Sequence, residues 1–305
     1  MADGQGNAEF RSGFVCFVGR PNTGKSTLTN ALVGQKIAIT SSRPQTTRHT
    51  IRGIVHRDHV QLILVDTPGL HRPRTLLGQR LNDLVRDTYS EVDVITLCVP
   101  ADEKIGPGDK WIVAQIKQMA PKTTVLGVVT KIDKVSRDQI AEQLLALSNL
   151  LGPDADVVPV SAVKGEQIEV LVDVIASKMP EGPAFYPDGE LTDEPEETLM
   201  AELIREAALE GVRDELPHSL AVVIEEILPY EEREDMLDVH AILYVERPSQ
   251  KSIIIGKGGA RLKEVGTNAR HQIEHILGTR IYLNLHVKVA KDWQRDPKQL
   301  GKLGF

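Results

Sequence analysis

The chain has 305 residues, which is more than one typical hydrophobic core serves, so the sequence predicts two domains. Hydrophobic residues make up 41% and charged residues 26%, which excludes a disordered, fibrous or disulfide-stapled protein, and no apolar run reaches the ~20 residues that span a bilayer. The net charge of -7 argues against indiscriminate binding to nucleic acid, although basic residues outnumber acidic ones over residues 247–305.

The N-terminal segment has no basic region followed by an apolar stretch, so we expect a flexible N-terminus over residues 1–12 and a cytoplasmic protein. Cys16 and Cys98 each lie inside an apolar run. We expect both to be reduced core residues rather than members of a disulfide or a metal site.

Short apolar runs alternate with amphipathic segments over residues 13–180, which is typical of parallel strands joined by crossover helices. Strands are predicted at 14–18, 51–56, 61–65, 92–99, 124–129 and 156–160, and helices begin near residues 25, 76, 109, 137 and 166. Only three residues separate the second and third strands, so these two should form an antiparallel hairpin. The pattern predicts an α/β domain whose mixed, mostly parallel sheet is covered on both faces.

The turn after the first predicted strand has the pattern of a phosphate-binding P-loop. Gly19 and Gly24 let the backbone curl around a phosphate with its N–H groups pointing inward. Lys25 would then reach the β- and γ-phosphates, and the Ser26 hydroxyl would coordinate Mg²⁺. The predicted nucleotide-binding residues of this turn are Gly19, Arg20, Pro21, Asn22, Thr23, Gly24, Lys25, Ser26 and Thr27.

The polar segment 41–48 is a candidate for a switch that nucleotide orders, because nothing apolar holds it in place. Either Thr46 or Thr47 supplies a hydroxyl to Mg²⁺ in this interpretation, and spacing alone leaves the choice open.

The segment Asp66, Thr67, Pro68, Gly69 follows the third predicted strand and belongs to the predicted nucleotide site. Asp66 would hold Mg²⁺ through water, and the Gly69 amide would contact the γ-phosphate. The next residue, Leu70, cannot orient a water as a glutamine does, so we expect slow intrinsic hydrolysis.

Two later segments at strand ends predict guanine specificity. In Thr130-Lys131-Ile132-Asp133, the Asp133 carboxylate can accept hydrogen bonds from guanine N1–H and the exocyclic amine, a donor pair that adenine lacks. The stem of Lys131 can cover the purine, and Ser161 and Ala162 can offer backbone N–H groups to guanine O6.

Residues 181–198 are rich in proline, glycine and acidic residues and are predicted to form a linker. A second domain, 199–305, follows with a helix at 198–213, strands at 219–227 and 236–246, helical segments around 256–259, a strand at 280–287 and a helix at 291–300.

The second domain contains the Gly-x-x-Gly loop of a KH domain, Gly256-Lys257-Gly258-Gly259, between two helical segments. Glycine lets a nucleic-acid backbone approach the loop, and Lys257 neutralises phosphate. The predicted RNA-binding residues are Ile255, Gly256, Lys257, Gly258, Gly259, Arg261, Lys263 and Arg270. Nearby, His271, Glu274 and His275 have the spacing of a zinc protease, but no third ligand accompanies them.

With these motifs in this order, residues 14–180 resemble translation-factor-related, Ras-like P-loop GTPase domains. The entire chain resembles the Era family of bacterial GTPases, which carry a C-terminal α+β KH domain of type II. The resemblance favours Thr47, beside Arg48, as the switch threonine. It also implies that a potassium ion assists hydrolysis next to Asn22, and it identifies one departure, Thr130, where the family usually has asparagine.

The resemblance further implies a monomeric GTP- and GDP-binding switch that contacts the 3′ end of small-subunit ribosomal RNA and acts in assembly of that ribosomal subunit. An alternative is a signalling GTPase in peripheral contact with the inner face of the cell membrane, acting through protein partners. Loss of RNA binding on changing the glycine loop would distinguish the two.

Overall fold

The computed structural model describes residues 10–40, 50–68, 75–212, 219–233 and 235–305. The chain divides into two compact units. The first contains Met1–Ile37, Thr47–His71 and Asp83–Asp193, and the second contains Ala38–Thr46, Arg72–Asn82 and Glu194–Phe305. The last division falls within the segment predicted as a linker.

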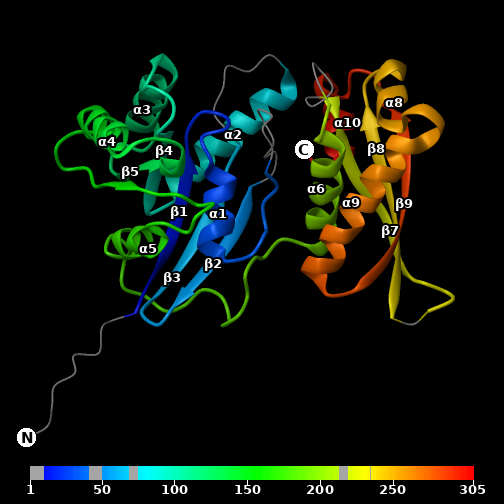
Figure 1. The fold of residues 1–305 in the computed structure, drawn as a ribbon, viewed down its shortest axis with the longest axis horizontal. Helices are drawn as coiled ribbons and strands as arrows, with labels where there is room; N and C mark the ends of the chain where they lie inside the picture. The colour runs from blue at the N-terminus through cyan, green and yellow to red at the C-terminus, as the bar shows by residue number, and fades with distance from the viewer. Residues whose placement is uncertain (1–9, 41–49, 69–74, 213–218, 234) are drawn as a thin grey trace, which may run out of the picture. The chain divides into compact units, whose positions relative to one another are not determined.

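A mostly parallel sheet forms the centre of the first unit (Figure 1). Its strand order is β2-β3-β1-β4-β5-β6, and only β2 and β3 pair antiparallel, which confirms the predicted hairpin. The strands are β1 (Arg11–Val18), β2 (Ile51–Arg57), β3 (Val60–Asp66), β4 (Val94–Pro100), β5 (Thr124–Thr130) and β6 (Val157–Pro159). The helices are α1 (Lys25–Val33), α2 (Leu76–Glu91), α3 (Pro107–Met119), α4 (Arg137–Leu151) and α5 (Ile168–Ala176), with the unit boundary inside α2.

Alternate side chains of the central strand enter two different cores. Val15 and Phe17 of β1 lie in a cluster with residues of α1 and α5, whereas Cys16 and Val18 lie in a cluster with residues of α2, α3 and α4. This is expected of a strand buried on both faces. Cys98 lies in the first cluster, and both cysteines are buried and free, as predicted.

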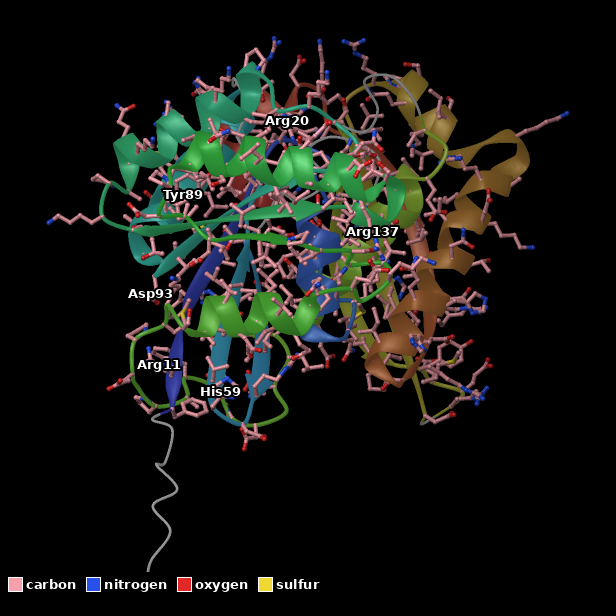
Figure 2. The ribbon with its side chains drawn as sticks, turned by 60° about the vertical axis from the view of Figure 1, so that its left-hand side comes forward. Arg11, Arg20, His59, Tyr89, Asp93 and Arg137 are labelled. Carbon is pink, nitrogen blue, oxygen red and sulfur yellow. The ribbon has the colours of Figure 1, made fainter. Side chains whose placement is uncertain are left out.

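The parallel strands all end at the same edge of the sheet. Figure 2 shows Arg20, just beyond the end of β1, far from Arg11 at its start, where the Arg11 amide donates to the His59 carbonyl over 3.1 Å. In a parallel sheet the ligand crevice forms outside the carboxyl ends, on the side of Arg20.

The second unit packs helices on one face of a three-stranded sheet of order β7-β8-β9. Strand β7 (Ala221–Pro229) runs antiparallel to β8 (Met236–Val245), which pairs parallel with β9 (Arg280–Val289). Helices α6 (Glu196–Leu209), α8 (Pro248–Ile255) and α9 (Ala260–Leu277) supply the rest of its core. This element order is that of the predicted type II KH domain.

The predicted final helix at 291–300 is wrong in its bounds. A short turn, η3 (Trp293–Arg295), comes first, and α10 (Pro297–Lys302) follows. The backbone before a proline disfavours helix, and Asp296 instead accepts a hydrogen bond from the Lys298 amide at 2.8 Å as the cap of α10. Among the helices in the described ranges, none has the length and apolar character to cross a membrane.

Candidate nucleotide site and RNA groove

The P-loop joins β1 to α1 through backbone conformations that few residues tolerate. A side chain at Gly19 would place its Cβ 2.6 Å from the Cys98 carbonyl oxygen, and Gly24 has a φ of 94°. Asn22 adopts a φ of 64° without being glycine. Such conformations cost free energy and cluster at functional sites, so the loop is shaped by tertiary contacts rather than by local preference.

Lys25 points back into this loop from the first turn of α1. Its Nζ donates to the carbonyl oxygens of Gly19, at 3.2 Å, and Arg20, at 3.0 Å, and the residue is 7% exposed. Burial lowers the pKa of Lys25, and the charge of Asp66 opposes that shift. A buried ammonium beside backbone amides is suited to an anion as highly charged as a triphosphate.

Ser26 and Asp66 bring two hard oxygen donors together. The Ser26 hydroxyl donates to Asp66 Oδ2 over 2.7 Å, and the Asp66 side chain is fully buried at the end of β3. A hydroxyl and a carboxylate at this separation fit Mg²⁺, which prefers a few oxygen ligands and retains waters. The other predicted ligands and switch residues, Thr46, Thr47, Gly69 and Leu70, lie outside the described residues.

The predicted guanine loop is stiffened around Asp133. The Ser161 hydroxyl donates to Asp133 Oδ1 at 2.6 Å, which orients the carboxylate, and Lys131 holds a φ of 58°. The amide of Ser161 is already committed, because it donates to the Glu166 carbonyl at 3.1 Å. This leaves the Ala162 amide, of the two predicted donors, as the candidate for guanine O6.

Thr130, the departure from the family pattern, connects this loop to the P-loop. Its hydroxyl donates to the Thr23 carbonyl over 2.6 Å, and the residue is 4% exposed. Its own carbonyl accepts the Ala101 amide at 2.8 Å. A threonine therefore tethers the base loop to the phosphate loop.

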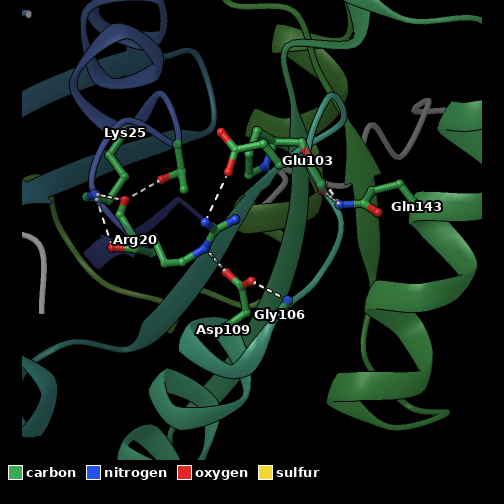
Figure 3. A network of polar contacts seen from close by, with 9 residues as sticks. Arg20, Lys25, Glu103, Gly106, Asp109 and Gln143 are labelled. Atoms are coloured by element: carbon green, nitrogen blue, oxygen red, sulfur yellow. Dashed lines mark hydrogen bonds and ion pairs between the residues drawn. The ribbon is translucent and has the colours of Figure 1, made fainter. Parts of the chain in front are cut away.

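The side chain of Arg20 turns away from the loop in which its backbone lies (Figure 3). Its Nε contacts Asp109 Oδ1 at 2.9 Å, and its Nη1 contacts Glu103 Oε2 at 3.0 Å. Partial burial opposes the charge of Arg20, but Asp109 and then Glu103 outweigh that effect and raise the pKa of the guanidinium. Sequence reasoning identified Arg20 but missed both carboxylates, since neither lies in a nucleotide-binding motif.

A groove beside the Gly-x-x-Gly loop is the candidate RNA site. It has a volume of about 430 Å³ and lies between α9 and the edge strand β9. Of the predicted residues, Gly259, Lys263 and Arg270 line it. The remaining lining residues, which sequence reasoning missed, are Leu262, Gly266, Thr267, Tyr282, Leu283 and Leu285. Their helical spacing on α9 identifies a shared face, but only the fold shows that β9 lies opposite.

The other predicted RNA residues have different surroundings. Lys257 and Gly258 are exposed in the loop, while Ile255 is half-buried beside the core. Arg261 is absent from the groove lining and donates to the carbonyls of Ala208, at 3.2 Å, and Glu210. Arg261 thus ties the loop to the end of α6.

One residue of the zinc-like spacing on α9, Glu274, makes a structural contact. Glu274 Oε1 accepts the Ile281 amide at 3.0 Å and so joins the end of α9 to β9. Over the part of the chain that the structure describes, no group of three or more His, Cys, Asp or Glu side chains could hold a metal ion.

The first unit has the features of a GTPase, namely a P-loop with a buried lysine, a serine paired with an aspartate, and a fixed guanine loop. The second unit has the groove of a KH domain, so the chain joins a GTPase to an RNA-binding domain. Two family models match the chain: "50S ribosome-binding GTPase" over residues 14–131 and "KH domain" over residues 215–294.

Curated and solved relatives extend over almost the whole chain. GTPase Era of Mycobacterium sp. (strain KMS) is 78% identical and covers 98% of this chain and all of the relative, and GTPase Era of Mycolicibacterium smegmatis is 77% identical over 97% and 99%. The solved structure of Era in complex with MgGDPNP and nucleotides 1506–1542 of 16S ribosomal RNA is 37% identical, with a TM-score of 0.92 over 97% of this chain and 99% of that one. The chain belongs to the Era family of GTPases.

Proposed function

We propose that this GTPase hydrolyses GTP and binds the 3′ end of small-subunit ribosomal RNA through its KH groove, acting in assembly of that subunit. One observation supports this proposal above all: the same chain has two sites. In the first, the P-loop is connected to the guanine loop, and the second is the groove beside Gly-x-x-Gly. A relative of the same domain composition has been solved with both MgGDPNP and a 16S ribosomal RNA segment.

The nucleotide site assigns a separate task to each group. The P-loop amides and Lys25 bind the phosphates, Asp133 reads the guanine edge, and Ser26 with Asp66 would hold Mg²⁺. When bound, Mg²⁺ offsets the charge that develops on the phosphate oxygens during transfer to water. Thr47 as the switch threonine and Gly69 as the γ-phosphate contact complete the proposed set.

Slow intrinsic turnover follows from Leu70, which offers no polar group to orient the attacking water. A potassium ion near Asn22 is the proposed source of the missing positive charge. Turnover should therefore be faster in potassium than in sodium buffer, and equal rates would remove potassium from the account.

The RNA groove combines two modes of contact. Lys263 and Arg270 offer positive charge to the RNA backbone, while Leu262, Leu283 and Leu285 offer an apolar surface to unstacked bases. We expect the protein to act in the cytoplasm, where ribosomal subunits form. Its monomeric state and any peripheral membrane contact stay predictions.

The two activities should separate by substitution. In Gly258→Asp/Gly259→Asp, the new carboxylates repel phosphate, and neither position has an atom within 4 Å that a Cβ would strike. The φ values there are 60° and 80°, and aspartate is among the residues other than glycine that occur most often at positive φ. This variant should lose binding to a 3′-end 16S ribosomal RNA fragment and keep its GTP affinity.

Asp133→Asn is the converse variant. It should lower GTP affinity by ~100-fold or more, the scale for unpaired groups in a base-reading site, and leave the KH groove unchanged. Fluorescence titration of both variants with both ligands tests the assignment. Undiminished RNA affinity in the glycine variant would contradict the KH role, and undiminished GTP affinity in Asp133→Asn would contradict the guanine site.

A further inference from the structure

The first half of the P-loop has no regular secondary structure and is held by side-chain contacts around Arg20. The Arg20 carbonyl accepts hydrogen bonds from Lys25 Nζ and from the Thr23 hydroxyl, both at 3.0 Å. Its guanidinium meanwhile contacts Asp109 and Glu103 (Figure 3). Arg20 therefore links the backbone that surrounds the phosphates to groups outside every nucleotide-binding motif.

Asp109 is held in position by contacts other than the one with Arg20. Its side chain is fully buried in the first turn of α3, and Oδ2 accepts the Gly106 amide at 2.9 Å. Pro107 at the start of the helix restricts the same turn. The carboxylate is thus a rigid acceptor, with Oδ1 left for Arg20 Nε.

The start of α3 is also shaped to receive the arginine stem. A Cβ on Gly108 would lie 2.9 Å from Arg20 Cδ, so only glycine leaves room there without a shift of the arginine. Behind Glu103, the Gln143 side chain of α4 donates to the carbonyls of Glu103, at 2.8 Å, and Pro100, at 3.0 Å. The anchor of Arg20 is consequently supported by two helices.

We propose that Asp109 is a positioning residue for the β-phosphate, acting through Arg20 to hold the P-loop amides in place. The inference rests on the proposed nucleotide site. Because Arg20 Nε and Nη1 already contact two carboxylates, we assign the contribution of Arg20 to the backbone that its side chain holds in place. The affinity of a binding site for its ligand falls when the contacts that hold its hydrogen-bond donors in position loosen.

Asp109→Asn is the most direct test. Its amide oxygen can still accept from Gly106, which places the NH2 group against Arg20 and removes the ion pair. In the full-length protein, affinity for GDP should fall ~10-fold or more, the size expected on losing a charge-assisted hydrogen bond. Affinity for GMP, which lacks the β-phosphate, should change by less than ~2-fold because Asp133 still reads the base.

Arg20→Gln tests the same link from the other side and leaves the Asp109 cap of α3 intact, so it serves even if Asp109→Asn fails to fold. The double variant Arg20→Gln/Asp109→Asn should bind GDP no more weakly than the weaker single variant, since both remove one link. The matched control is Arg57→Gln, which breaks another ion pair of the first unit, between Arg57 Nη2 and Glu169 Oε1 at 2.6 Å. This control should leave GDP affinity unchanged.

Three outcomes would overturn the inference: unchanged GDP affinity in both single variants, equal weakening of GDP and GMP, or additive losses in the double variant. Equal weakening would mean a general structural role, and additivity would mean that Asp109 does not act through Arg20. Failure of the unaltered protein to bind GDP would instead contradict the proposed function, so the two failures are distinguishable.

Discussion

Thr130, which departs from the family motif, connects the guanine loop to the P-loop. Asparagine is usual at this position in the family that the chain resembles. The threonine hydroxyl nevertheless reaches the Thr23 carbonyl at 2.6 Å in a buried setting, where a hydrogen bond is costly to remove. Loop rigidity is thus supplied by a shorter side chain.

Thr130→Val should weaken GTP and GDP binding ~10-fold, because valine matches the shape of threonine and leaves the Thr23 carbonyl without its donor. Stopped-flow dissociation of a fluorescent GDP measures the effect, which we expect in the dissociation rate. Thr88→Val is the matched control, since it removes a comparable bond to the Leu84 carbonyl of 2.9 Å within α2. Equal dissociation rates in the two variants would contradict the tether.

Asp109 marks the limit of sequence reasoning at this site. Gly19, Lys25 and Asp133 could be predicted as candidates because each belongs to a motif whose residues lie close together in the sequence. Asp109 lies 89 positions from Arg20. Its local sequence indicates only an acidic residue in the first turn of a helix and gives no sign of a contact with the P-loop. Contacts of this kind depend on the packing of α3 beside the P-loop, which only the fold reveals.

The elements were easier to predict than their ends. Apolar runs and the short hairpin connection identified the sheet, because period and loop length directly determine which strands are parallel. The bounds of α10 were missed because Pro297 and Asp296 begin a new helix inside an otherwise helical composition. The α9 face of the RNA groove could be inferred from spacing, whereas Tyr282 and Leu285 of β9 required the sheet order.

Because α9 packs against β9 beside the groove, we expect Gly266→Leu to preserve or raise stability and to lower RNA affinity. A Cβ at Gly266 would make ordinary contact with Leu285 Cδ1 at 3.5 Å, and in Gly266→Leu we expect the rest of the side chain to occupy the groove that Gly266 lines. The free energy of unfolding should stay the same or rise by about 0.5–1 kcal/mol, because leucine has a higher helix propensity than glycine. RNA affinity should fall ~10-fold or more, because the side chain takes the place of RNA in the groove.

Gly301→Leu provides the control for that experiment, because Gly301 lies in α10 with no atom within 4 Å of an added Cβ. It should change stability in the same direction without affecting RNA affinity. If Gly266→Leu binds RNA as well as Gly301→Leu does, the groove is not the RNA site.

At the scale of the whole protein, the candidate nucleotide site and the candidate RNA groove lie in separate folded units, each with its own core. Both units belong to one chain, and we expect a nucleotide that changes the order of the switches to change RNA binding as well.

The most direct test of a nucleotide-controlled RNA-binding GTPase is the affinity of the full-length protein for a 3′-end 16S ribosomal RNA fragment, measured with Mg²⁺ and either a non-hydrolysable GTP analogue or GDP. The account predicts saturable binding that exceeds binding to a scrambled RNA and differs ~5-fold or more between the two nucleotides, the usual size of coupling between sites. Equal affinity in both nucleotide states, or equal affinity for the scrambled RNA, would contradict it.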